Sequence, residues 1–198
     1  MMQAGTRPYL IAQDLACRRG DRILFRGLSV ELAAGDALHV TGANGVGKTT
    51  LIKAMAGLLT PFTGEIDVGG SIGLVDDRPA LDPDLPLEKA LAFWARVDQC
   101  VDPSQAIASL GLQSLLDVPV QYLSTGQKKR GALAALINSG AQIWLLDEPL
   151  SGLDKDAVSG VNTLIERHIK RGGIALIASH QKLAIDGLKT LAIEDYAP

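Results

Sequence analysis

The chain has 198 residues, 47% of them hydrophobic and 21% charged, which is enough apolar sequence to build a buried core. Its formal net charge of −3 argues against the basic surface that nucleic-acid binding requires, so we expect no nucleic-acid partner. Its two cysteines, Cys17 and Cys100, are far apart and lack metal-ligand spacing, which favours reduced thiols in a cytoplasmic protein.

The apolar segments are too short to cross a membrane. The strongest of them, residues 143–146 and 174–178, fall far short of the roughly 20 residues that a spanning helix needs. Residues 1–10 contain Arg7 but no apolar stretch and no small-residue cleavage site, which argues against a secretory signal. We therefore expect that any membrane role depends on other subunits.

Short apolar runs alternate with helical patterns, and this alternation predicts an α/β fold with a mostly parallel core sheet. We expect one domain over residues 1–198. Alternating segments near residues 10–12, 28–32 and 65–68 predict a small antiparallel β layer at the edge. Core strands are expected at 37–41, 143–146 and 174–179, and helices at about 48–59 and 156–171.

Between the first helix and the second half of the chain lies a stretch with a different pattern. Residues from about 78 to 123 form helical patterns that Pro and Asp interrupt repeatedly. Together with the helix that starts at Ser124, they predict a small helical subdomain.

A glycine-rich loop follows the strand at 37–41. Glycines let backbone N–H groups turn inward and bind phosphate at a helix N-terminus. Lys48 would reach the β- and γ-phosphates, and the Thr49 hydroxyl would ligate Mg²⁺. Because a strand precedes the loop and a helix follows it, a turn that binds nothing is disfavoured. We predict an ATP site that includes Thr50 and the segment matching G-x-x-x-x-G-K-[ST], namely Gly42, Ala43, Asn44, Gly45, Val46, Gly47, Lys48 and Thr49.

Two carboxylates follow the apolar strand at 143–146. Asp147 and Glu148 stand at its carboxyl end, where sheets of this class place ligands. Asp147 suits a Mg²⁺ ligand, and Glu148 suits a general base for an attacking water. By itself the pair could be an ordinary polar strand end before Pro149, but the phosphate-binding loop favours the catalytic interpretation.

The segment Leu123-Ser124-Thr125-Gly126-Gln127 opens another helix. Ser124 and Gln127, three residues apart, predict a capping box. The helix would aim free N–H groups outward, which makes a second phosphate-binding terminus. One ATP cannot easily use both termini within a small domain, so the pattern implies a second subunit.

Together these segments resemble the ATP-hydrolysing subunit of ABC transporters. The signature of that family is L-S-G-G-Q, from which this chain departs only by Thr125. Ser151-Gly152-Leu153-Asp154 and His180 match two further motifs of the family. The order and spacing of the motifs agree, and the resemblance covers about residues 10–193. It implies a P-loop NTPase fold of ABC type.

The resemblance also implies roles for individual residues. Two copies would pack head to tail around two ATP molecules, each with Mg²⁺, to form a homodimer. The segment Ser124, Thr125, Gly126 and Gln127 of one copy would face the ATP of the other, with Ser124 and Gly126 on the γ-phosphate. Asp154 would couple the two sites. His180 would sense the γ-phosphate and hold the water with Glu148, so Glu148, His180 and Lys48 are the expected catalytic residues.

The chain departs from the family at two positions. Arg19 lies in the segment where the family has an aromatic residue that stacks on adenine. Its guanidinium could stack on the base instead, or it could be a solvated hairpin charge. Asp77 falls where the family has a glutamine near Mg²⁺, which leaves open whether Asp77 contacts the metal or the attacking water.

The chain resembles one subfamily in these departures, in its short length and in the pair His180-Gln181. This subfamily is the ATP-binding subunit of the bacterial cytochrome c maturation (haem exporter) system. This similarity implies integral membrane subunits, indirectly a periplasmic haem chaperone, and a peripheral location on the cytoplasmic face of the inner membrane. The ATPase of a different small-substrate ABC transporter is the main alternative. A DNA-repair or translation ABC protein, a P-loop kinase or GTPase, and a catalytically inactive module are less favoured.

Overall fold

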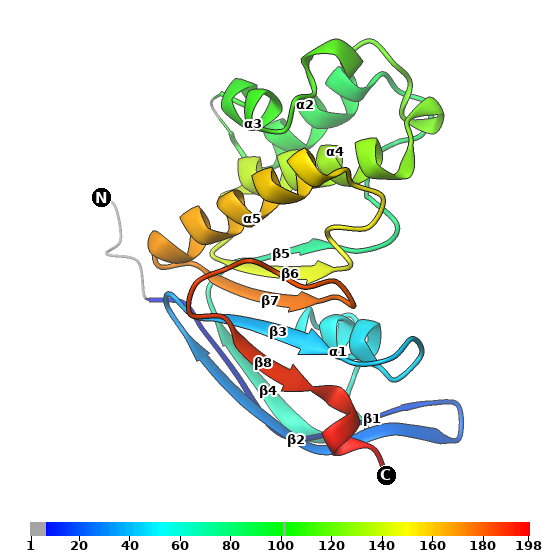
Figure 1. Ribbon diagram of the computed structural model, residues 1–198, viewed down its shortest axis with the longest axis vertical. Helices are drawn as coiled ribbons and strands as arrows, with labels where there is room; N and C mark the ends of the chain where they lie inside the picture. Colours follow the sequence, from blue (N-terminus) through cyan, green and yellow to red (C-terminus); the bar gives the residue numbers. More distant parts are fainter. Residues whose placement is uncertain (1–6, 101) are drawn as a thin grey trace.

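A sheet of five parallel strands forms the centre of the computed structural model, which describes residues 7–100 and 102–198 (Figure 1). Neighbouring strands pair in parallel throughout this sheet, as expected when crossover connections join them. The strand order is β5 (Ile72–Val75), β6 (Ile143–Asp147), β7 (Ile174–Ala178), β3 (Ala37–Thr41) and β8 (Lys189–Ala192).

A second, antiparallel sheet packs beside the first. Its central strand β1 (Tyr9–Arg19) pairs with β2 (Arg22–Ala33) on one side and with β4 (Thr63–Gly69) on the other. Helix α1 (Lys48–Met55) lies between the two sheets (Figure 1). The antiparallel layer predicted from three short segments is thus confirmed, with longer strands than those segments indicated.

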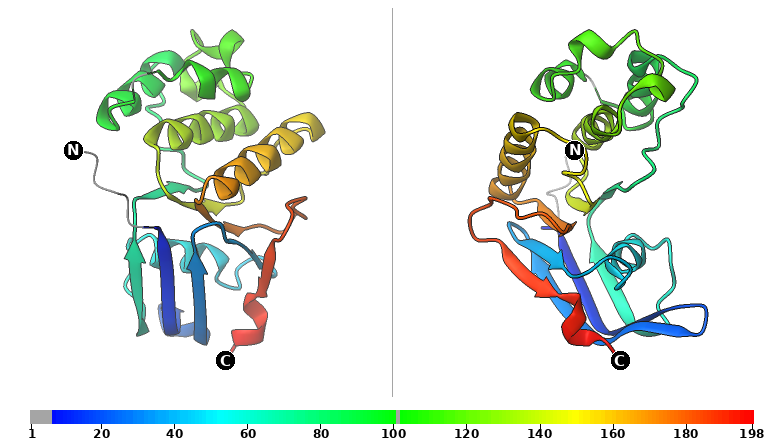
Figure 2. Two further views of the ribbon diagram at one scale, coloured as in Figure 1. Left: turned by 90° about the vertical axis from the view of Figure 1, so that its left-hand side faces the viewer. Right: turned by 45° about the vertical axis from the view of Figure 1, so that its right-hand side comes forward.

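The remaining helices cover the opposite face of the core sheet. Helices α4 (Thr125–Ser139) and α5 (Lys155–Lys170) lie next to it, and α2 (Leu87–Val97) and α3 (Ser104–Ser109) lie farther out, against α4 (Figure 2). Short 3-10 turns at Gln113–Leu115 and Val120–Tyr122 join α3 to α4, and a third, η3 (Ile193–Tyr196), follows β8. In the described part of residues 78–123, short helices and 3-10 turns therefore alternate with irregular segments.

Side-chain alternation along β6 divides the interior into two cores. Trp144 and Leu146 pack with the helices, whereas Ile143 and Leu145 pack with α1 and the antiparallel sheet. Both sets are buried because the sheet is covered on both faces, which explains why the strand reads as a continuous apolar run.

The first helix is shorter than predicted. It ends at Met55 instead of continuing to about residue 59, because Gly57 adopts a left-handed conformation (φ 71°) just after it. Leu58, expected on the apolar face of the helix, is consequently 66% exposed. The strands at 143–146 and 174–179 differ from the prediction by one residue each, at their carboxyl ends.

Candidate functional site

The glycine-rich loop connects β3 to α1 and is shaped by its glycines. Gly42, Gly45 and Gly47 have positive φ angles of 140°, 80° and 124°, a conformation that residues with a Cβ rarely adopt. A side chain at Gly47 would also press on Phe25 and Leu24. The loop conformation therefore depends on glycine at these positions.

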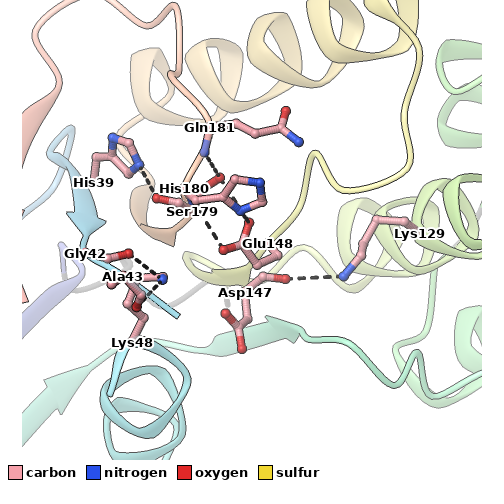
Figure 3. Close-up of polar contacts among 10 residues, drawn as sticks. All are labelled: His39, Gly42, Ala43, Lys48, Lys129, Asp147, Glu148, Ser179, His180 and Gln181. Atoms are coloured by element: carbon pink, nitrogen blue, oxygen red, sulfur yellow. Dashed lines mark hydrogen bonds and ion pairs between the residues drawn. The ribbon is translucent and has the colours of Figure 1, made fainter. Parts of the chain in front are cut away.

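Lys48 is folded back over this loop. Its ammonium group donates to the carbonyls of Gly42 and Ala43 at 2.7 and 3.1 Å (Figure 3), and the residue is only 6% exposed. These two carbonyls satisfy the hydrogen-bond donors of the buried Lys48 ammonium. Because this cation lies at the start of α1, it suits an anionic ligand.

The two carboxylates predicted as catalytic stand at the end of β6. Asp147 is buried, and Glu148 follows it with a positive φ of 47°, which is unusual for a residue with a side chain. The Glu148 N–H donates to the carbonyl of Ala178 at 2.8 Å, so the neighbouring strand holds this conformation. Such strain is concentrated at functional sites.

The carboxylate of Glu148 accepts two hydrogen bonds from the segment after β7 and lies beside the His180 ring (Figure 3). Its Oε1 accepts from the His180 N–H at 3.2 Å. Its Oε2 accepts from the Ser179 hydroxyl at 3.2 Å and lies 2.9 Å from Nδ1 of His180. Glu148 and His180, 32 residues apart in sequence, are thus brought together as predicted.

One cavity of about 490 Å³ joins the glycine-rich loop to the two carboxylates. Its volume lies in the range of sites that hold a small ligand. Arg19, at the tip of the β1–β2 hairpin, lines it as well. The lining residues are Arg19, Leu24, Asn44, Gly45, Gly47, Lys48, Thr49, Thr50, Lys53, Leu59, Asp147 and Glu148.

Asp147 provides a possible metal ligand in this cavity. Its Oδ1 is buried and has no hydrogen-bond partner among the residues that the structure describes. Burial raises the pKa of this carboxyl, and the nearby Thr49 hydroxyl is the main opposing influence. A buried carboxylate oxygen beside a hydroxyl fits Mg²⁺, which usually takes one or two protein ligands and completes its shell with water and substrate phosphates.

The segment Leu123–Gln127 lies elsewhere, at the start of α4. Ser124 accepts from the Gln127 N–H at 3.2 Å, and the Gln127 side chain accepts from the Ser124 N–H at 2.8 Å, which is the predicted capping box. In the part of the chain that the structure describes, none of Ser124, Thr125, Gly126 and Gln127 lines the cavity above. Ser124 and Thr125 are exposed and accessible to another molecule.

Gly126 touches the loop that precedes α5. A Cβ on Gly126 would overlap the carbonyl oxygen of Gly152. Asp154, two residues later, is exposed and caps α5 by accepting from the Ala157 N–H at 2.8 Å. The signature segment and the loop with Asp154 are therefore packed directly against each other.

The departures from the family pattern have definite positions. The guanidinium of Arg18 lies 4.7 Å from the centre of the Phe62 ring, which leaves its neighbour Arg19 facing the cavity. Asp77 is exposed in the loop after β5, outside the cavity lining among the described residues, but its charge acts on Asp147 and Lys129.

Three site residues were not predicted from the sequence. Ser179 holds Glu148, and Glu194 in η3 accepts from the Ala43 N–H at 2.7 Å. Lys129, in α4, is buried and reaches the backbone of Asp147. The sequence contains no signal for Glu194 or Lys129, because only the tertiary fold brings them to the loop and to β6. Ser179, directly before His180, could have been inferred.

No helix among residues 7–100 and 102–198 combines the length and apolarity needed to span a bilayer.

Comparison with known proteins places these motifs in a family. The ABC transporter family model matches residues 25–151. The cytochrome c biogenesis ATP-binding export protein CcmA of Novosphingobium aromaticivorans is 55% identical and covers 96% of this chain and 97% of its own. The protein of the same name from Zymomonas mobilis is 48% identical and covers 94% of this chain and 85% of its own.

Solved structures of ABC transporter proteins also resemble this chain. An ABC transporter ATP-binding protein from Pyrococcus furiosus superimposes with a TM-score of 0.82 at 26% identity, covering 96% of this chain and all of that one. A metal-chelate type ABC transporter in an inward-facing conformation gives a TM-score of 0.79 at 27% identity, covering 94% and 80%. The chain therefore belongs to the ABC transporter family and, within it, to the cytochrome c biogenesis ATP-binding export proteins.

Proposed function

We propose that this chain is the ATP-hydrolysing subunit of the membrane exporter that handles haem for cytochrome c biogenesis. The near full-length similarity to CcmA proteins supports the biological role. The observation that carries the chemistry is the single cavity that joins the phosphate-binding loop, Thr49 and the Asp147-Glu148 pair.

ATP binding follows from the charges around the loop. The loop Gly42–Thr50 would offer the N-terminus of α1 and the Lys48 ammonium to the phosphates. In the structure that ammonium contacts only loop carbonyls, so it is available to exchange them for phosphate oxygens. Arg19 would stack its guanidinium on the adenine at the open end of the cavity.

Thr49 and Asp147 would hold Mg²⁺. Asp77, outside the cavity lining among the described residues, is a further candidate ligand of this metal. When bound, Mg²⁺ offsets phosphate charge and favours departure of the β-phosphate oxygen. The exposed position of Asp77 suits an indirect influence better than direct ligation.

Glu148 would accept a proton from the water that attacks the γ-phosphate. A carboxylate has about four lone-pair sites, and hydrogen bonds from the Ser179 hydroxyl and the His180 N–H occupy two of them. A water could therefore still bind to this carboxylate. His180 would release Glu148 to contact the γ-phosphate, and the products are ADP and phosphate.

A homodimer would complete each site. Ser124 and Gly126 stand outside their own cavity, so they would meet the γ-phosphate held by Lys48 of a second copy. Asp154 is exposed beside this segment, where it would link the two sites. Hydrolysis removes the shared phosphate, so the dimer loses the interaction that favours its closed state.

The dimer would work on the cytoplasmic face of the bacterial inner membrane, bound to integral membrane subunits. The opening and closing of the dimer would be transmitted to the membrane subunits through the loop around Asp77 and the helices over residues 78–123. The expected outcome of this cycle is haem delivery to, or release of, a periplasmic haem chaperone.

The proposal is tested in cells by replacing the chromosomal gene with one that encodes Glu148→Gln. Membranes are stained for covalently bound haem, and the haem-loaded chaperone is followed in parallel. Loss of c-type cytochromes with trapped chaperone is expected. Normal cytochromes, with the variant expressed and inactive in vitro, would reject the haem role and leave an ATPase that serves another transporter.

A further inference from the structure

Lys129 is a buried cation that joins three elements of the site. It lies in α4 and is 3% exposed. Its ammonium donates to the carbonyl of Asp76, in the loop after β5, at 2.7 Å. It also donates to the carbonyl of Asp147, at the end of β6, at 3.2 Å (Figure 3). One side chain therefore fixes the backbone of both neighbouring segments to the helix.

The surroundings of Lys129 carry an excess of negative charge. Burial lowers the pKa of Lys129, and the carboxylates of Asp147, Asp76, Asp77 and Glu148 oppose this effect by favouring its charged form. Among the described residues, Lys48 and Lys129 are the two buried lysines, and the contacts of Lys48 are to the phosphate-binding loop. Lys129 is thus the buried counter-charge on the side of the carboxylates away from that loop.

We propose that Lys129 is a positioning residue of the ATPase site, which balances the charge of Asp77 and holds the Asp147 end of β6 and the loop after β5 in register with α4. This inference rests on the proposed function, because it takes Asp147 and Glu148 as the residues that act on ATP. Among the described residues, Lys129 is not part of the cavity lining.

An apolar residue could not replace Lys129. It would leave two buried carbonyls without donors, and a buried unsatisfied polar group is destabilising. It would also remove a positive charge that acts on Asp77 and on the Asp147-Glu148 pair.

In the proposed dimer, Lys129 would lie between the two nucleotide sites. It stands five residues after Ser124 on the same helix, about 7.5 Å along the helix axis. A shift of α4 caused by the partner's ATP at Ser124 would pull on the Asp147 carbonyl through Lys129. The helix would in this way report occupancy of one site to the metal ligand of the other.

A double-mutant cycle on the full chain tests the charge balance. The variants are Lys129→Met, Asp77→Asn and the pair together, and each is measured for kcat, for KM of ATP and for thermal unfolding. Lys128→Met is the matched control, because Lys128 is the adjacent lysine of α4 and contacts only the Gln121 carbonyl among the described residues.

We expect Lys129→Met to lower kcat at least about 10-fold with KM changed less than about 2-fold, and the added Asp77→Asn to recover at least about 3-fold, as coupled neighbours do. The kcat of Lys128→Met should not increase when Asp77→Asn is added. If Lys129→Met does not fold, Lys129→Gln keeps an N–H donor without the charge, and Asp77→Asn should rescue it likewise.

The outcomes separate this inference from the proposed function. A parent chain that hydrolyses ATP, with Asp77→Asn restoring neither kcat nor unfolding temperature to the Lys129 variants, overturns the role of Lys129. A parent chain without ATPase activity contradicts the proposed function instead. In that case the unfolding temperatures of the single and double variants alone show whether Lys129 and Asp77 balance each other's charge.

Discussion

Oε2 of Glu148 lies 2.9 Å from Nδ1 of His180, and the Ser179 hydroxyl donates to the same oxygen. These contacts hold Glu148 in its strained backbone conformation at the edge of the cavity. The carboxylate is therefore positioned before ATP arrives, and the residues that position it come from the end of a single strand, β7.

Ser179→Ala should weaken this positioning without touching ATP. Loss of one hydrogen bond to a charged group should lower kcat about 3- to 10-fold, with KM for ATP nearly unchanged. Steady-state kinetics give the result. Ser139→Ala is the matched control, since its hydroxyl bonds the carbonyl of Leu136 far from the cavity. An equal loss of kcat in the Ser179→Ala and Ser139→Ala variants would argue against a specific role for Ser179.

Gly126→Ala should destabilise the chain, because the added methyl group overlaps the Gly152 carbonyl. We expect a loss of about 1 to 3 kcal/mol in the free energy of unfolding. Gly160→Ala is the control in α5: a Cβ there meets open space among the described residues, so alanine should stabilise by up to about 1 kcal/mol. Chemical denaturation measures both, and a Gly126→Ala variant as stable as the parent would contradict this packing.

Arg19→Ala should weaken ATP binding. Loss of a partly exposed stacking contact is worth about 0.5 to 1 kcal/mol, which corresponds to a rise of about 2- to 5-fold in the Kd. Arg22→Ala is the control, because Arg22 pairs with Arg19 across the hairpin but does not line the cavity among the described residues. If both variants bind ATP equally well by titration calorimetry, Arg19 is a solvated hairpin charge.

Stability should fall in mild acid because of His168. Its ring stacks on Trp144 with centroids 3.9 Å apart, and burial lowers the pKa of His168 below the ordinary 6.5. As pH falls below 6.5 the unfolded chain takes up a proton that the folded chain does not, so unfolding becomes favoured.

Thermal unfolding between pH 7.5 and 5.5 checks this effect. His168→Phe keeps an aromatic ring without the titrating group and should flatten the pH dependence over this window. A parent chain whose unfolding temperature is constant across the window would show that His168 protonates equally in both states.

The sequence predicted the parts of the fold that have strong local patterns. The loop at Gly42, the apolar strand before Asp147 and the capping box at Ser124 each combine a motif with a matching element, and all three are present. Strands β5 and β8 were not predicted. Residues 72–75 form an apolar run of only four residues that includes a glycine, and a run this short does not by itself identify a strand. Residues 189–192 include a lysine and a threonine and show no clear apolar pattern.

The supporting residues of the site lay beyond sequence reasoning for a physical reason. Lys129 follows the signature segment on a helix, where a lysine is usually solvated. Its burial depends on the loop after β5 and on β6, which are 53 and 18 residues away in sequence. Contacts of this kind are set by the tertiary fold and leave no local pattern.

The most direct test of the account is the turnover of the purified Glu148→Gln variant, measured beside its ATP binding and its oligomeric state. We predict that ATP affinity is retained, that turnover falls at least ~10²-fold, and that ATP shifts the variant to a dimer in size-exclusion chromatography. Turnover close to that of the parent chain would contradict the assignment of Glu148 as the base at the centre of this site.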